Sequence, residues 1–375
     1  MTDAADARIS RRLSEQGFRA ISPLVDFGGQ EMNIKSILLG TAAGLMAVTG
    51  AQAADLPGEP VPVAVDYVKV CDTFGAGFFY IPGTETCLDI SGRVRFRVTA
   101  YESGADDDFT VQFRADARVD FDARTMTEYG QLRSFFRLAT NSSDGILVEG
   151  AFIQLGYVTA GLAGDLYNAD VLYGINDAAV ENHDEATQLT VLVDDIGGGF
   201  YVGASIMSAA DYDLRDEFYD DYLPELQAAI GIADQPWGSF DLSLQYIPDE
   251  ERVIGSDDRF SVKATADLTV FEGLSARLAA AYFSDSPEEF ARGGVADGDE
   301  TIMLSGAVSY AFSDAAAVYA GLRYDMQDES DDDLFANIGV DYTVTSGLVL
   351  TGEVSYAEID NDDSLQGIVQ LSRTW

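Results

Sequence analysis

The chain has 375 residues and is strongly acidic, with 64 Asp and Glu against 22 Lys and Arg and a formal net charge of −42 at pH 7. This balance excludes nucleic acid as a partner, because phosphate backbones are bound by clustered Lys and Arg. It also argues against electrostatic docking on an anionic membrane surface. No segment after residue 53 contains the roughly 18 consecutive apolar residues of a transmembrane helix, so any membrane insertion must use strands.

The first 53 residues predict processing signals rather than a folded domain. Residues 1–31 are polar and without pattern, and we expect an upstream extension read from a start codon assigned too early; a true cytoplasmic leader is the alternative. Residues 32–53 predict a Sec signal peptide, with Lys35 in the n-region, an apolar stretch over 37–48 and an A-x-A cleavage site at 51–53. The mature chain would then begin at Ala54 and be exported through the Sec pathway.

Residues 54–87 form an N-terminal segment that contains both cysteines of the chain, Cys71 and Cys87. The periplasm permits disulfides, and an even number of cysteines in an exported chain favours one here. The bond would close a loop of about 15 residues, worth about 3 kcal/mol in the chain-entropy description. Two unpaired thiols are the alternative.

From residue 88 to residue 375 the sequence repeats one pattern: segments of about ten residues, apolar at every second position and separated by Gly, Asp, Asn and Ser. We count about sixteen segments. They begin near residues 88, 109, 128, 147, 161, 187, 198, 224, 238, 258, 273, 300, 315, 332, 347 and 364.

Short and long connections alternate along this region. Short ones are predicted at 124–127, 160, 195–197, 235–237, 272, 314 and 345–346, and long acidic ones include 102–108, 168–186, 210–223, 285–299 and 328–331. This plan predicts an all-β, sixteen-stranded antiparallel transmembrane β-barrel over 88–375, with short periplasmic turns and long external loops. The sheet has to close, because backbone groups in lipid must be paired internally. A soluble calcium-binding β-protein is disfavoured because glycine-aspartate nonapeptide repeats are missing from the sequence.

The chain ends on Trp375, at the apolar parity of its last alternating segment. A terminal aromatic in this position resembles the signal that the outer-membrane assembly machinery recognises. We therefore predict Trp375 to be the assembly signal.

Residues 53–97 carry a family resemblance. The run AADLP, followed by VDYVKVCDTFGAGFFYIPGTETCLDISGRVRFR, closely resembles the start of the mature outer-membrane porins of Rhizobiales and other alphaproteobacteria, and QPWGS at 235–239 matches the same pattern. Two features depart from it: the loops are more acidic and the last residue is Trp. The resemblance implies a homotrimer of sixteen-stranded barrels, each with its third external loop folded into the pore. It implies a general diffusion porin for ions and small hydrophilic solutes; a substrate-specific channel for a sugar or an organic ion is the alternative.

The chemistry of such a pore is the shape and charge of its constriction. A basic wall is predicted on the lumen parity of the first three strands, formed by Arg93, Arg95, Arg97, Arg114, Arg118, Arg133 and Arg137. An opposing acidic wall is predicted on the third long connection, formed by Asp170, Asp177, Glu181, Asp184 and Glu185. The alternatives are arginines that merely pair with Asp116, Asp120 and Asp122, and a loop that stays solvated outside.

Acidic clusters at 106–108 and 331–333 would face the outer leaflet or the medium. Because Ca²⁺ and Mg²⁺ bind carboxylate oxygens, bridging to lipopolysaccharide through these ions is one hypothesis. A solvated face that keeps the pore mouth open is the alternative that the sequence favours. No cofactor is otherwise expected.

Catalysis is not expected. His183 is the single histidine of the chain, no nucleophile motif accompanies it, and the carboxylates show no distinguishing spacing.

Overall fold

The computed structural model describes residues 69–103, 108–141, 145–167, 171–176, 186–194, 196–208, 224–248, 258–285, 300–328, 330–359 and 362–375. All of them belong to the second of two units, Asp66–Trp375. The predicted upstream extension and signal peptide lie outside the described residues. Within the described part of the chain, no helix is long and apolar enough to cross a membrane.

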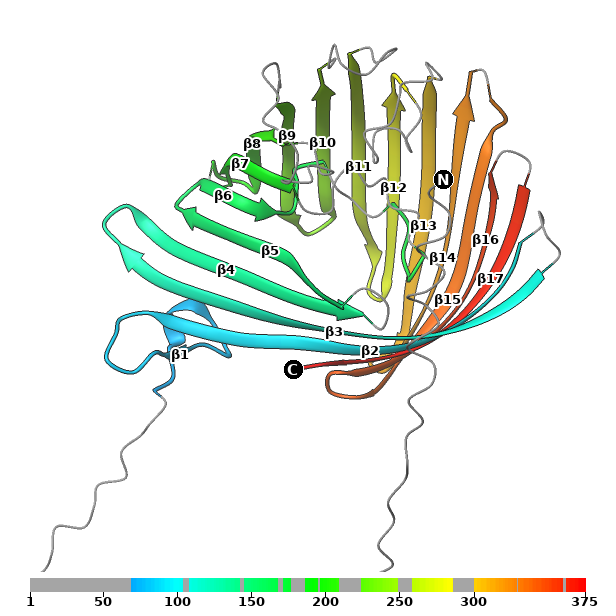
Figure 1. The fold of residues 1–375 in the computed structure, drawn as a ribbon. Helices are drawn as coiled ribbons and strands as arrows, with labels where there is room; N and C mark the ends of the chain where they lie inside the picture. Colours follow the sequence, from blue (N-terminus) through cyan, green and yellow to red (C-terminus); the bar gives the residue numbers. More distant parts are fainter. Residues whose placement is uncertain are drawn as a thin grey trace, which may run out of the picture. The chain divides into compact units, whose positions relative to one another are not determined.

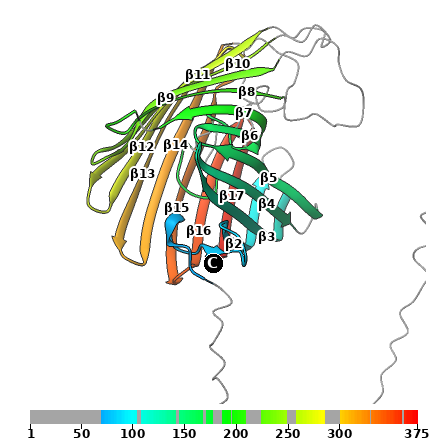
Figure 2. The same cartoon turned by 90° about the vertical axis from the view of Figure 1, so that its left-hand side faces the viewer.

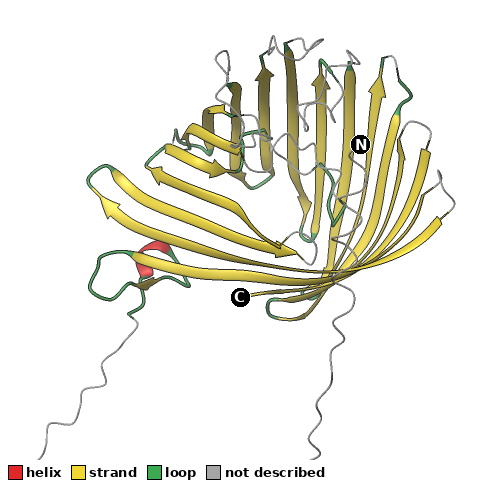
Figure 3. Ribbon diagram, viewed as in Figure 1, coloured by secondary structure: helices red, strands yellow, loops and turns green. Residues whose placement is uncertain are grey.

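Strands dominate the described residues (Figure 3). A 3-10 helix (Asp72–Phe74) and the two-residue strand β1 (Phe79–Tyr80) precede sixteen barrel strands. These are β2 (Cys87–Ser103), β3 (Asp108–Thr127), β4 (Gly130–Asn141), β5 (Gly145–Leu155), β6 (Val158–Ala163), β7 (Ala186–Val193), β8 (Phe200–Met207), β9 (Glu225–Gln235), β10 (Gly238–Ile247), β11 (Arg259–Phe271), β12 (Leu274–Phe283), β13 (Thr301–Ser313), β14 (Ala316–Gln327), β15 (Asp333–Thr345), β16 (Leu348–Ile359) and β17 (Asp362–Thr374).

Each barrel strand pairs antiparallel with the next one in the chain, and β17 pairs with β2 to close the ring (Figures 1 and 2). At the seam the backbones of Gly92 and Trp375 exchange two N–H···O bonds of 3.2 Å. Closure pairs the last barrel strand with the first, so that neither is left as an open edge in a lipid environment. The predicted sixteen-stranded antiparallel barrel is confirmed.

The two faces of the barrel wall are inverted relative to a soluble protein. Ile338 and Val354 are 60% and 49% exposed on the outer face, whereas their lumenal neighbours Asn337 and Glu353 are 5% and 4% exposed. An apolar exterior suits the hydrocarbon of a bilayer, and a polar interior suits a water-filled channel. The apolar residues of the alternating pattern therefore face lipid, and the polar residues between them face the lumen.

The strands begin within three residues of the predicted positions, but two of the predicted short turns are wrong. Residues 124–127 belong to β3, and the turn lies at 128–129, where the Thr127 hydroxyl donates to the Gly130 carbonyl oxygen at 2.7 Å. Ala160 lies within β6, and the turn lies at 156–157, where Gly156 has φ +56°. In both cases the turn forms at neighbouring residues whose side chain or backbone favours it, Thr127 in the first turn and Gly156 in the second.

The predicted disulfide joins Cys71 and Cys87. The two cysteines are 0% and 1% exposed and pack with Phe78 in a small apolar cluster beside the start of β2. The Arg124 guanidinium lies 4.9 Å from the centre of the Phe78 ring. The N-terminal segment is thus fastened to β2 and β3 before the chain enters the barrel.

Candidate pore constriction

The connection between β6 and β7, residues 164–185, is the third of the connections at the end of the barrel opposite the short turns, and we call it L3. Its described parts lie inside the barrel. Tyr167, Val171 and Leu172 are almost fully buried against Phe283 and Met303, which project from the lumenal side of β12 and β13. This cluster gives the barrel interior a local apolar core. The predicted inward fold of the third loop is therefore confirmed.

Lys263 on β11 holds the first part of L3. Its ammonium group is 0% exposed, donates to the Tyr167 carbonyl oxygen and lies 4.2 Å from the centre of the Tyr167 ring. Gln227 on β9 adds two bonds of 2.9 Å: its Oε1 accepts from the Leu166 N–H, and its Nε2 donates to Asp165. Burial raises the pKa of the Tyr167 phenol above its ordinary value.

Glu353 on β16 holds the far part of L3. Its carboxylate accepts from the backbone N–H groups of Ile175 at 2.6 Å and Asn176 at 2.9 Å, and from the Tyr319 hydroxyl at 2.7 Å. Gly174 has φ +112°, which turns the two following N–H groups toward the carboxylate. Charge-assisted bonds of this kind are about twice as strong as neutral ones.

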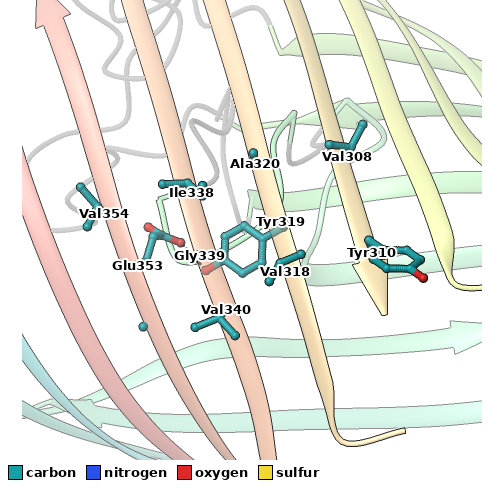
Figure 4. A pocket seen from close by; sticks show the side chains of 11 residues that line it. Val308, Tyr310, Val318, Tyr319, Ala320, Ile338, Gly339, Val340, Glu353 and Val354 are labelled. Atoms are coloured by element: carbon teal, nitrogen blue, oxygen red, sulfur yellow. Dashed lines mark hydrogen bonds between the residues drawn. The ribbon is translucent and has the colours of Figure 1, made fainter. Parts of the chain in front are cut away.

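Two glycines make room for this contact. A Cβ on Gly174 would stand 2.2 Å from the Glu353 carboxylate, and one on Gly339 would stand 2.3 Å from the Tyr319 hydroxyl. Figure 4 shows Tyr319 crossing Gly339 toward Glu353. A groove of about 450 Å³ on the same strands is lined by outward-facing apolar side chains such as Val340. The wall here is one sheet thick, with the L3 attachment on its inner side.

A pair of asparagines extends the attachment to the last strand. The Asn337 amide donates to the carbonyl oxygens of Tyr173 at 2.5 Å and Asn176 at 2.8 Å. The Asn176 amide in turn donates to Ser355 at 2.5 Å and to Gln366 on β17. The described L3 segments therefore contact β7, through the bond from Gln188 to the Gly164 carbonyl oxygen, and the strands from β9 to β17.

All seven predicted arginines lie on the lumenal face of β2, β3 and β4, as the register shows. Four have a carboxylate partner within 4 Å. Their ion pairs are Arg95–Asp116 at 2.7 Å, Arg118–Asp120 at 3.6 Å, Arg133–Asp122 at 2.9 Å and Arg137–Asp120 at 2.9 Å. The pairing that the sequence left open as an alternative is thus present for part of the set.

The other three arginines, Arg93, Arg97 and Arg114, make no ion pair among the residues that the structure describes. Arg93 stands directly across from Arg118, and Arg97 from Arg114. Like charges directly opposite each other destabilise a sheet. Arg97 relieves part of this by donating to Gln370 on β17 at 2.8 and 3.1 Å. The lumenal face of β2–β4 therefore keeps positive charges that no ion pair among the described residues neutralises.

The five predicted acids of L3, residues 170, 177, 181, 184 and 185, lie outside the described residues, as does His183. Their role as an acidic wall stays a prediction. The residues that the sequence analysis missed are the attachments of L3, above all Lys263, Asn337 and Glu353. Lys263 carried one signal, because it is one of three lysines in the chain and stands at lumenal parity.

A closed barrel with an apolar outside, a polar inside and an inward loop defines a transmembrane channel of the bacterial outer membrane. The porin subfamily matches residues 55–374 of the chain, and the protein belongs to this family. Membership confirms the predicted outer-membrane location and a channel rather than an enzyme.

The chain is 31% identical to porin Omp2b of Brucella abortus (strain 2308) and to porin Omp2b of Brucella canis, over 92% of this chain and 100% of each relative. Solved structures share the fold at lower identity. The outer membrane channel DcaP of Acinetobacter baumannii superposes with a TM-score of 0.63 at 13% identity, covering 79% of this chain and 99% of that one. OmpF of Salmonella typhi gives 0.59 at 13% identity, covering 79% and 99%. The predicted resemblance to alphaproteobacterial porins is confirmed.

Proposed function

We propose that the protein is a general diffusion porin, a passive water-filled channel for ions and small hydrophilic solutes. The observation that carries the proposal is the course of L3. Its described segments attach to β7 and to β9–β17, whereas the arginine face lies on β2–β4. A polar lumen that the described parts of L3 narrow suits diffusion filtered by size and charge.

The seven arginines form the basic wall of the constriction in this proposal, and the five acids of L3 form the opposing wall. A field between the two walls would orient polar solutes and disfavour apolar ones. The unneutralised Arg93, Arg97 and Arg114 supply the part of this field that the fold does not cancel. The strongly acidic chain favours cations at the pore mouths and the arginines favour anions, so we expect a weak ion preference.

We further propose that the channel is a homotrimer. β6, β7 and β8 have only 6, 8 and 8 residues, fewer than the roughly 9–11 that a strand needs to cross the hydrocarbon. Outward apolar side chains such as Val191 and Ile206 are nevertheless 44% and 46% exposed on this low wall. Burial against a second and a third copy would cover them without requiring these strands to span lipid.

The test is single-channel conductance of the refolded mature protein in a planar bilayer, with reversal potentials under a salt gradient and sugars of increasing size. Large steps in multiples of three with a weak ion preference are expected. Small currents blocked by one sugar would instead establish a substrate-specific channel. No current at all would overturn the open pore.

The trimer has its own test. Val191→Arg on the low wall should convert the trimer to monomers in native mass spectrometry, whereas Leu304→Arg on the outer face of the long strand β13 serves as the matched control. Equal behaviour of the two variants would contradict the assignment of the contact to β6–β8.

A further inference from the structure

An aromatic pair interrupts the polar lining of the lumen. Phe135 on β4 and Phe152 on β5 stand opposite each other in register, with ring centres 5.1 Å apart and planes 21° apart. Phe135 also pairs with Asp122, a lumenal residue that is 7% exposed, whereas the next residue, Phe136, is 39% exposed on the outer face. Both rings therefore face the channel, on the same face as the arginines of β4.

Two arginines of the basic wall lie against these rings. The Arg133 guanidinium is 5.2 Å from the centre of Phe135 and 5.1 Å from that of Phe152, and the Arg137 guanidinium is 5.2 Å from Phe135. Asp122 holds Arg133 and Asp120 holds Arg137. Fixed positive charge thus borders a flat apolar surface, and we call these four side chains the aromatic–arginine platform: Phe135, Phe152, Arg133 and Arg137.

The strand geometry fixes the platform. The register of β4 and β5 shifts between Arg137 and Leu138, and the buried Gly150 lies under the Phe135 ring, where a Cβ would stand 3.1 Å from Cε1. A bulge with a glycine at this point gives the ring its place. Both phenylalanine rings remain only half-buried, so a solute can reach them.

The platform lies on the same wall as the arginines. Phe135 pairs with Asp122 on β3, and Arg97 on β2 pairs with Arg114 on the same strand β3, so the rings and the arginines share one lumenal face. A solute that follows the arginine wall along the lumen therefore passes the two rings.

We propose that the aromatic–arginine platform is a binding subsite for planar aromatic carboxylates that cross the pore. The solute ring stacks against the phenylalanine pair in an offset arrangement, while its carboxylate accepts hydrogen bonds from the bordering guanidinium groups. Neither element alone selects this class: a small carboxylate lacks the ring, and a neutral sugar lacks the charge. The inference rests on the proposed channel function and names one solute class that the channel favours.

The experiment compares sodium benzoate, cyclohexanecarboxylate and acetate as blockers of the chloride current through the full mature protein in a planar bilayer. Benzoate should reduce the current at concentrations several-fold lower than either of the others. Phe135→Leu and Phe152→Leu should each weaken the benzoate effect by about threefold to tenfold, the range expected for losing an aromatic stack. Phe136→Leu, on the same strand but facing lipid, is the matched control. Benzoate should block the chloride current of this variant as it blocks that of the wild type.

The outcomes separate the two proposals. A normal chloride current with equal block by benzoate and cyclohexanecarboxylate would overturn the subsite and leave the porin function intact. If no current flows, the porin function fails, and saturation-transfer NMR of benzoate with the folded protein in detergent decides the subsite alone. Folding of each variant is checked by the heat-dependent mobility of the barrel in gels, and the two Phe variants must agree.

Discussion

The indole ring of Trp375 covers Gly92: a Cβ on Gly92 would stand 2.5 Å from Cζ2 of the indole and 2.6 Å from the Arg118 carbonyl oxygen. The last residue of the chain thus completes the ring of strands against β2 through its backbone and its side chain together. Only a residue without a side chain fits beneath the indole at this seam.

Replacing Gly92 should impair closure of the barrel. Gly92→Val forces the indole and the neighbouring strand apart, and we expect a loss of about 1–3 kcal/mol, as in other overpacked sites, with slower folding into detergent micelles. Gly367→Ala, at the same seam but with 4.0 Å to its nearest neighbour, should fold like the wild type. Trp375→Ala tests the proposed assembly signal through the yield in outer membranes, and normal yield would contradict it.

Weakening the L3 attachment should widen the pore and increase the noise of its single-channel current. Glu353→Gln removes the charge that three donors share, and charged hydrogen bonds contribute about 1.5–3 kcal/mol. We expect larger and more variable single-channel currents and faster proteolysis within L3. Glu358→Gln makes the same chemical change farther along β16, away from L3, and should leave both unchanged. Identical currents in the two variants would show that other contacts hold the loop.

Neutralising the unpaired arginines should shift ion selectivity toward cations. Arg93→Gln and Arg114→Gln remove charges without a described carboxylate partner, and we expect the cation-to-anion permeability ratio to rise by about twofold for each. Reversal potentials under a potassium chloride gradient measure the ratio. Arg373→Gln carries the same charge change but lies near the end of β17, where its guanidinium donates to the Ser346 carbonyl oxygen. If Arg373→Gln changes the permeability ratio as much as Arg93→Gln or Arg114→Gln does, the effect is not specific to the arginines of the basic wall.

Removing the disulfide should loosen the N-terminal segment and spare the channel. The Cys71→Ser, Cys87→Ser double variant loses about 3 kcal/mol of chain-entropy stabilisation, so protease should cut the N-terminal segment sooner. Conductance should not change, because the strands of the barrel keep all their pairings. Wild-type protein should resist a reductant while folded, since both sulfurs are buried. Loss of conductance on reduction would place the segment in the pore.

Chelation tests the proposed divalent bridge to lipopolysaccharide. In the cluster at 331–333, Asp332 accepts from the Tyr324 hydroxyl and the Gln327 N–H, and Asp333 accepts from the Gln327 amide. These carboxylates already accept hydrogen bonds within the connection between β14 and β15, so a divalent cation would have to bind their remaining lone pairs. If divalent ions bridge these carboxylates to lipopolysaccharide, a chelator should lower the melting temperature of the protein and release bound lipopolysaccharide; if they form the solvated face that the sequence favours, both should stay unchanged.

The sequence predicted the barrel well because lipid and lumen impose opposite chemistry on alternate residues, and that contrast is visible in segments such as 109–122. The disulfide could be predicted because the chain holds two cysteines. The turns at 128–129 and 156–157 were misplaced because strand ends are decided by single contacts, such as the Thr127 hydroxyl bond.

The attachments of L3 could not be predicted for a different reason. Glu353 and Asn337 look like any polar residue at lumenal parity, and their partners lie more than a hundred residues away in the chain. The lumenal position of Phe135 could not be predicted because Phe136 follows it. One of two adjacent phenylalanines faces lipid, and the local pattern does not tell which. Long-range contacts, not local pattern, separate a pore-lining residue from one that holds the loop.

The course of L3 also sets an order of events during biogenesis. Asn176 precedes its partners Ser355 and Gln366 by 179 and 190 residues, and these partners belong to the last two strands. The loop cannot settle until the final hairpin is in place. This attachment of L3 therefore forms only after β16 and β17 are in place, so the narrowing of the pore is among the last features to form.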